Sequence, residues 1–149
     1  MLESIYRDRK WQAADQSQRN LKMTIEEKIN KSETHVFKVV FPDTTNHHNT
    51  MFGGRILMMM TETAFMTATR FSRKNFVLVS SGQIDFAKPI PAGTLVELVG
   101  RVQRIGNTSI TIQVEVYLEK MSEEFREKVV SGAFTLVAIG EDQQPVSVH

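Results

Sequence analysis

Apolar and polar residues alternate with two different periods along the chain, and each period predicts one type of element. A long apolar run follows the pair Gly53-Gly54 and contains no proline and no further glycine until Gly82. Helix-forming residues dominate it, which predicts a helix over 54–72, about 20 residues or roughly 30 Å long. Small residues in its second half predict close packing against a sheet. The face expected to share this packing consists of Leu57, Met60 or Thr61, Ala64, Thr67 and Ala68.

Strand-like segments lie on both sides of this helix. They are rich in β-branched and aromatic residues or alternate in polarity, and they cover 34–41, 76–86, 95–105, 109–118 and 129–139. Gly106-Asn107 predicts a tight turn that joins two of them. Gly82 predicts a bulge or a close backbone approach inside another. The segment 109–118 has one apolar and one polar face. The apolar face consists of Ile110, Ile112, Val114 and Val116, and the polar face of Thr111, Gln113 and Glu115.

The order of these elements restricts the fold class. A parallel βαβ sheet is excluded, because four strands follow one helix with only short, hairpin-type links between them. We therefore expect an α+β fold in which an antiparallel sheet of five or six strands wraps around the long helix. Such a sheet leaves edges that need partners, which favours edge-to-edge dimerisation.

The spacing of apolar residues in 1–32 predicts a helical extension, which precedes the main domain, 33–149. Apolar residues recur there at spacings of three and four, as in Leu21, Ile25 and Ile29. Packing on the domain or on a neighbouring subunit and a role as a recognition element both remain open.

Composition removes several classes of function. The formal net charge of +1 gives no support for a nucleic-acid partner. The chain has no cysteine, which excludes disulfides, thiolate zinc sites and cysteine nucleophiles. The N-terminus lacks the apolar core of a signal peptide, and no window is apolar enough for a membrane span. We therefore expect a cytoplasmic protein of 149 residues that does not act on a membrane.

The glycine pair is the strongest candidate for chemistry. Glycines at a helix start leave backbone N–H donors bare at the positive end of the helix dipole, where a carbonyl oxygen or an anion can bind. One acid, Glu62, follows about two turns later. The preceding loop contains His47 and His48, but adjacent histidines rarely face one ion and no third ligand stands at helical spacing. We predict no metal site.

These residues form a pattern that resembles the hotdog-fold acyl-CoA thioesterases, and most closely the cytosolic acyl-CoA hydrolase group that includes the YciA-like enzymes. The resemblance covers about 33–147 and lies in Pro42-Asp43-x-x-Asn46, Phe52-Gly53-Gly54, Ile56-Leu57, Ile84-Asp85-Phe86-x-Lys88-Pro89-Ile90-x-x-Gly93 and Val137-Ala138-Ile139. It implies a helix wrapped by its sheet, and dimers that assemble to a tetramer or hexamer with active sites between subunits. Coenzyme A enters only as part of the substrate, and no other cofactor is implied.

The resemblance also implies roles for individual residues. Gly53 and Gly54 hold the thioester carbonyl, and a carboxylate on the helix is base or nucleophile. In the family group that acid stands seven residues after the second glycine, where this chain has Thr61; Glu62 follows directly, so both are candidates. Three polar residues of the preceding loop are candidates to orient water or the carbonyl: Asn46, Asn49 or Thr50. Four basic residues are candidates to contact the phosphates of CoA: Arg70, Arg73, Lys74 and Lys88. The candidates to line an acyl pocket are Met51, Phe52 and Met58.

Three departures from the family pattern accompany Thr61. Asn49 stands where glycine is common, Thr50 where Asn, Asp or His is common, and Gly82 where an acid is common. The first functional hypothesis is hydrolysis of acyl-CoA to a free fatty acid and CoA. The alternative is a catalytically weakened domain that binds acyl-CoA as a sensor or assembly module. A dehydratase ranks below both, because His47 and His48 do not form a dehydratase-like pattern. Alternatives without a function remain open for each group of residues. Glu62 would then be a plain surface acid, the basic residues would be solvated charges, and the methionines would fill the core.

Overall fold

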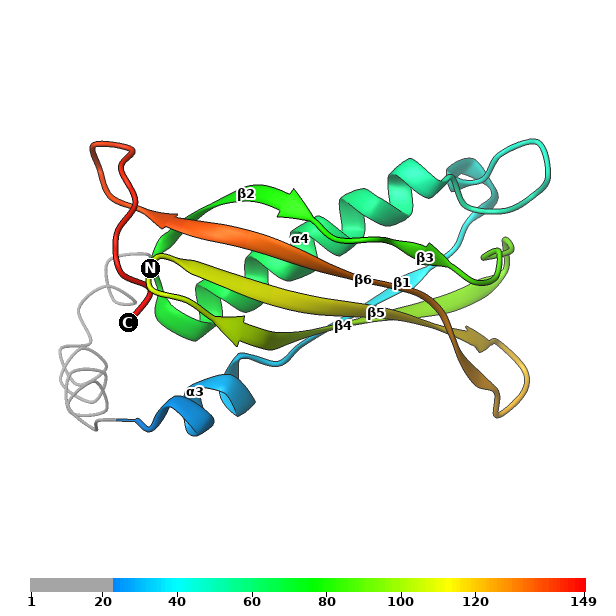
Figure 1. Ribbon diagram of the computed structural model, residues 1–149. Helices are drawn as coiled ribbons and strands as arrows, with labels where there is room; N and C mark the ends of the chain where they lie inside the picture. The colour runs from blue at the N-terminus through cyan, green and yellow to red at the C-terminus, as the bar shows by residue number, and fades with distance from the viewer. Residues whose placement is uncertain (1–22) are drawn as a thin grey trace, which may run out of the picture.

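The computed structural model describes residues 23–149, and Figure 1 shows a long helix held against a curved sheet. The part of the predicted helical extension that falls in residues 1–22 lies outside the described residues. The elements are α3 (Ile25–Ser32), β1 (Thr34–Val39), the 3-10 turn η1 (Pro42–Thr44), α4 (Gly53–Ser72), β2 (Asn75–Ser81), β3 (Asp85–Phe86), β4 (Thr94–Ile105), β5 (Ser109–Lys120) and β6 (Arg126–Ile139).

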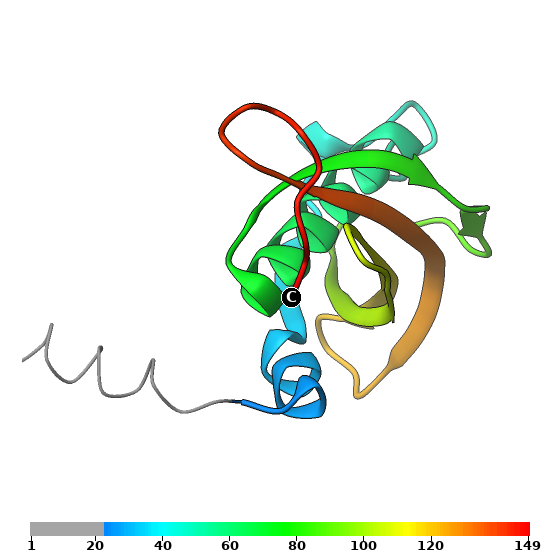
Figure 2. The ribbon, with the colours of Figure 1, turned by 60° about the vertical axis from the view of Figure 1, so that its left-hand side comes forward.

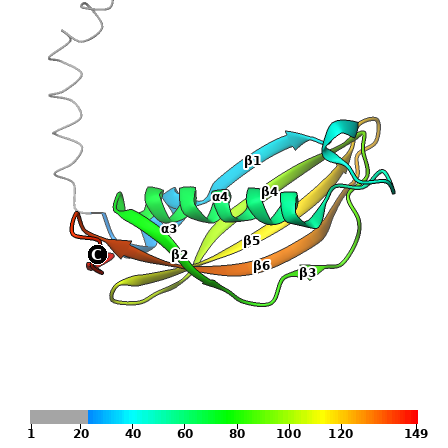
Figure 3. The same ribbon diagram turned by 90° about the horizontal axis from the view of Figure 1, so that it is seen from above.

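All the strands belong to one antiparallel sheet of six strands in the order β1-β4-β5-β6-β2, and β3 pairs with the far end of β6. The sheet curves around α4 (Figure 2), and α4 lies lengthwise against its concave side (Figure 3). The expected α+β fold, with a central helix wrapped by an antiparallel sheet, is confirmed. β1 and β2 are the two edges of the main strand order.

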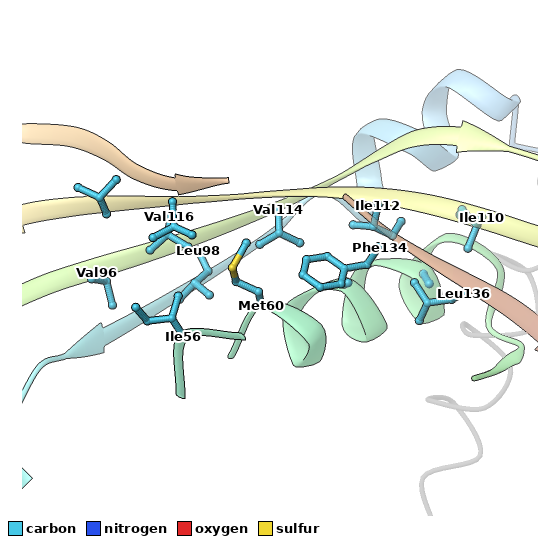
Figure 4. Packing of buried hydrophobic residues seen from close by; sticks show 14 of the residues in the cluster. Ile56, Met60, Val96, Leu98, Ile110, Ile112, Val114, Val116, Phe134 and Leu136 are labelled. Atoms are coloured by element: carbon cyan, nitrogen blue, oxygen red, sulfur yellow. The ribbon is translucent and has the colours of Figure 1, made fainter. Parts of the chain in front are cut away.

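The core lies between α4 and the concave face of the sheet (Figure 4). From α4 it contains Ile56, Met60, Thr63, Ala64, Thr67, Ala68 and Phe71. The helix therefore buries Ile56 where we expected Leu57, which is only half-buried. On β5 the predicted apolar face, Ile110, Ile112, Val114 and Val116, is at most 1% exposed and faces the helix.

Two segments differ from the sequence prediction. The single strand expected over 76–86 is two strands, because the register against β6 shifts between Leu78 and Ser80 and the chain leaves the sheet after Ser81. The Gly82 N–H donates to the Ala133 carbonyl, 2.9 Å away. The polar tail also folds back, since its Val148 is fully buried.

The helix α3 is fixed at both ends. At its start Thr24 and Glu27 form a capping box, in which each side chain accepts a hydrogen bond from the backbone N–H of the other. At its end the Arg70 guanidinium, from α4, donates to the carbonyls of Lys31 and Glu33 at 3.0 and 2.7 Å. No helix within residues 23–149 is long and apolar enough to cross a membrane.

Candidate active site

The loop that leads into α4 is tied by backbone hydrogen bonds to the segment before β4. The Met51 N–H donates to the Ile90 carbonyl at 2.8 Å, and the Ala92 N–H donates to the Asn49 carbonyl at 3.0 Å. Thr50 and Pro91 form a bridge between these two bonds. The residues directly before the glycine pair are therefore held in place by the segment 90–92, which follows Lys88 and Pro89.

Asn46 organises this loop from inside. Its Oδ1 accepts from the His48 N–H at 2.9 Å, and from the Thr50 N–H and hydroxyl at 3.3 and 3.2 Å. Asn49 adopts a left-handed φ of 62°, which explains why glycine is common at this position and why asparagine is the residue that replaces it here. Because the oxygen of Asn46 is occupied, its amide NH₂ is the group that can reach a ligand.

The first turn of α4 presents free donors. Its N-cap is Phe52, whose side chain makes no capping hydrogen bond and whose carbonyl accepts from Arg55 and Ile56. The N–H groups of Gly53 and Gly54 have no acceptor among residues 23–149. These donors lie at the positive end of a 20-residue helix, so they can bind a carbonyl oxygen on which negative charge develops.

Neither glycine of the pair is required by the fold of the subunit. Neither has a positive φ. A Cβ at Gly54 would meet nothing within 4 Å, and one at Gly53 would touch only the ring of Phe86, at 3.7 Å. Alanine would fit both positions and would favour the helix by up to about 1 kcal/mol each, the value for a helix interior. The space that bare backbone leaves at Gly54 is therefore open to a ligand or to another subunit.

The two candidate catalytic residues on α4 lie in different directions. At 100° per residue, Thr61 is about 20° from Gly54 around the helix axis, whereas Glu62 is about 80° away. The Thr61 hydroxyl donates to the Met58 carbonyl at 2.8 Å. Glu62 is exposed and forms no ion pair within the described part of the chain. The two share a shallow groove with Phe65 and Met66.

The basic candidates for CoA lie in two places. Arg70, Arg73 and Lys74 are at the C-terminal end of α4, about 25–30 Å along the axis from the glycine pair of the same subunit. The Arg70 donors contact the end of α3, and Arg73 caps α4 with a left-handed φ of 56°. Lys88 pairs with Glu127.

The acyl-pocket candidates are not alike in burial. Met51 is a core residue, 6% exposed, whereas Phe52 and Met58 are 56% and 49% exposed. Phe86, which sequence reasoning used only as part of a motif, lies against Gly53. The rings of His47 and His48 lie with their centroids 3.9 Å apart and their planes tilted by 44°. Among residues 23–149 no three His, Asp or Glu side chains converge on a metal-sized site.

Exposed apolar side chains gather where β2 forms the edge of the sheet. Val77, Leu78 and Val79 are 40–55% exposed there, and Phe65 and Met66 on α4 are 46% and 37% exposed. A free edge strand with apolar side chains is a surface suited to a second chain.

Comparison with known proteins identifies the family. Residues 48–125 match the family model of the thioesterase superfamily. An uncharacterized acyl-CoA thioester hydrolase of Zymomonas mobilis is 34% identical over 110 residues, 74% of each chain. An uncharacterized acyl-CoA thioester hydrolase of Bacillus subtilis is 35% identical over 109 residues, and the match spans 63% of that relative.

Solved structures give the same result. The acyl-CoA hydrolase of Bacillus cereus superposes with a TM-score of 0.78 at 33% identity, over 80% of this chain and 73% of that one. That of Staphylococcus aureus, solved with butyryl-CoA and CoA, has a TM-score of 0.77 at 28% identity with the same coverage. It was also studied with alanine in place of an Asn, an Asp and a Thr. Two further neighbours are hexameric acyl-CoA thioesterases. The chain therefore belongs to the hotdog-fold acyl-CoA thioester hydrolases of the thioesterase superfamily.

Proposed function

We propose that this chain hydrolyses acyl-CoA to a free fatty acid and CoA at the start of α4. The observation that carries the proposal is the pair of free N–H groups on Gly53 and Gly54, two glycines that the subunit does not need for its own packing. The thioester carbonyl oxygen binds these donors. A donor fixed on a developing oxyanion lowers the barrier by about 3–4 kcal/mol.

Glu62 is the base in this proposal. It takes a proton from a water molecule, whose oxygen forms a bond to the thioester carbon while the carbonyl electrons move to the oxygen held by the glycines. The tetrahedral intermediate then expels the CoA thiolate, which receives the proton from Glu62. Thr61 is less suited to the role, because a hydroxyl needs a partner base and this one donates to the Met58 carbonyl.

The site is completed by a second subunit in this proposal. Glu62 lies about 12 Å along the axis from Gly54 of its own helix, too far for both to act on one carbonyl. Antiparallel pairing of two β2 edges would place two α4 helices side by side in opposite directions. With the two helices overlapping over their N-terminal halves, the glycine pair of one subunit would face Glu62 of the other. Arg73 and Lys74 of that second helix would lie about 16 Å further along its axis, where they can contact CoA phosphates.

Further assembly and location follow from relatives. Because two structural neighbours are hexameric, we propose that dimers assemble to a hexamer, with a tetramer as the alternative. A rat relative, 26% identical over 122 residues, is named a cytosolic hydrolase, and we propose the cytoplasm here too.

A specific observation favours the second candidate, an acyl-CoA-binding module with weak turnover. In the S. aureus variants the Asp stands fifteen positions after the Asn, and the Thr a further seventeen. The same spacing in this chain leads from Asn46 to Thr61 and then to Leu78. The asparagine is present, but the acid and the hydroxyl are replaced.

One assay tests both candidates. Release of CoA from butyryl-CoA and longer acyl-CoAs is followed with a thiol reagent, which gives no background because the chain has no cysteine. We expect turnover by the wild type, and a loss of at least about a hundredfold in kcat for Glu62→Gln. The matched control, Glu124→Gln, changes an exposed acid on the β5–β6 connection and should keep full activity.

The outcomes separate the candidates. Acyl-CoA binding without turnover in the wild type contradicts the hydrolase and supports the binding module. In that case Thr61→Asp, alone and with Leu78→Thr, should create turnover. Full activity in Glu62→Gln contradicts only the choice of base. Size-exclusion chromatography with light scattering reports the assembly, and a monomer contradicts the shared site.

A further inference from the structure

The aromatic ring of Phe86 lies beside the proposed oxyanion site. A Cβ placed on Gly53 would be 3.7 Å from Cε1 and 3.8 Å from Cζ of this ring, so the tip of the ring is in van der Waals range of the first residue of α4. The side chain is nevertheless 48% exposed. It therefore has one side against the glycine and another side open.

The backbone under this ring is fixed. Phe86 pairs with Val130 of β6, and the next two N–H groups, of Ala87 and Lys88, both donate to the Val129 carbonyl at 2.9 and 3.2 Å. Directly paired residues in an antiparallel ladder point to the same face of the sheet. Val130 is 1% exposed and belongs to the core. Phe86 is thus directed to the helix side of the sheet at the point where α4 begins.

Core packing does not account for this side chain. It lies outside the buried cluster, so this half-exposed position forgoes part of the stabilisation that full burial of the ring would give. A large apolar ring held in a fixed position with one side open is suited to contact an apolar group of a ligand.

We propose that Phe86 is a specificity-determining wall for the acyl carbon next to the thioester carbonyl. This inference rests on the proposed function, because it takes the carbonyl oxygen to bind Gly53 and Gly54. An oxygen about 3 Å from those nitrogens puts the carbonyl carbon and its neighbour within a few ångströms of the ring tip. The far end of an acyl chain cannot be there too. Phe86 therefore restricts branching at the first carbon, and other residues set chain length.

The test compares butyryl-CoA with isobutyryl-CoA, which have the same atoms and differ only in branching, and uses hexanoyl-CoA to report chain length. Phe86→Ala should raise the isobutyryl-to-butyryl ratio of kcat/KM about tenfold, the effect of one methyl group against a wall. The hexanoyl-to-butyryl ratio should change less than about threefold. Phe86→Leu keeps an apolar side chain on the strand, and its isobutyryl-to-butyryl ratio should lie between those of the wild type and Phe86→Ala. It replaces the alanine variant in the test if that variant does not fold.

Phe37→Ala is the matched control, because Phe37 is 59% exposed and pairs with Glu97 on the opposite, outer face of the sheet. It should leave both ratios unchanged. The proposal is overturned if the Phe86 variants keep the wild-type branching ratio, or if chain length responds as strongly as branching. If the wild type turns over no acyl-CoA, the proposed function fails, and calorimetric Kd values for the same three thioesters decide the role of Phe86 by the same two ratios.

Discussion

Glycine serves opposite purposes at two places along α4, one in the first turn of the helix and one in β4 where that strand crosses the helix. At the start of the helix, Gly53 and Gly54 have room for a side chain. Where the helix crosses β4, a Cβ at Gly100 would be 2.3 Å from the Thr67 hydroxyl oxygen and 3.1 Å from Cγ2 of Thr63. The sheet comes this close because its strand has no side chain there. Gly100 is thus required by packing, whereas the pair at the helix start is not.

The difference separates residues kept for stability from residues kept for chemistry. Both groups look alike in the sequence, since each is a glycine in a regular element. A substitution by alanine should affect stability and activity in opposite ways at the two places.

The largest effect is expected for Gly54→Ala. The added methyl group enters the space in which the carbonyl oxygen approaches the N–H donors, so kcat should fall about a hundredfold. The subunit itself should become more stable by up to about 1 kcal/mol, because alanine favours the helix. Turnover of butyryl-CoA and urea denaturation measure the two quantities on one preparation. A fall in stability would mean that a second subunit fills this space.

A smaller effect, and the opposite one, is expected for Gly100→Ala. The methyl group would overlap the buried Thr67 hydroxyl, which donates to the Thr63 carbonyl, and overpacking of this kind costs about 1–3 kcal/mol. The free energy of unfolding from urea titration measures the loss. Activity per folded molecule should change far less than in Gly54→Ala.

Two further variants control this result. Gly82→Ala places its Cβ at an ordinary 3.8 Å from the Ala133 carbonyl oxygen and should be close to neutral. Combining Gly100→Ala with Thr67→Ala removes the nearest overlapping atom and should recover part of the loss. Additive losses in the double variant would contradict the proposed overlap.

The sequence predicts the elements and the fold well because periodicity reports burial directly. β5 alternates as expected, and the long helix starts within one residue of its predicted position. Two features depend on contacts between distant segments and could not be read this way. The break between β2 and β3 follows from a register shift against β6. Val148 is buried because the polar tail folds back.

In the site, the sequence indicates where the helix starts but not which residues surround that start. The glycine pair has a recognisable position, yet only coordinates tell that alanine would fit there. The sequence does not indicate that Phe86 touches Gly53, thirty-three residues away in the chain, or that Arg70 is engaged by α3. The one available signal for Phe86 was its place in a motif that accompanies the glycine pair.

The smallest effect concerns His35, on β1 beside the same crossing, where Val99 is its register partner. Its Nδ1 lies 2.6 Å from Oε1 of Glu97 and its Nε2 lies 2.6 Å from Oε1 of Glu33. The hydrogen bond to Glu97, and then that to Glu33, raise the pKa of His35, although burial opposes them. The hydrogen bond from Arg101, and then that from His35, lower the pKa of Glu33.

A raised histidine pKa stabilises the folded protein below the ordinary value of about 6.5, and this contribution is lost as pH rises through the folded value. The free energy of unfolding should therefore fall as the pH rises above about 6.5, by less than about 1 kcal/mol, because His35 is partly exposed to water. His35→Gln should remove that fall, and His149→Gln, which changes an exposed histidine near the chain end, should retain it. An identical pH slope in His35→Gln would contradict the assignment of this fall to His35, and with it a pH-dependent contribution from the outer side of the strand pair in which Thr34 faces Gly100.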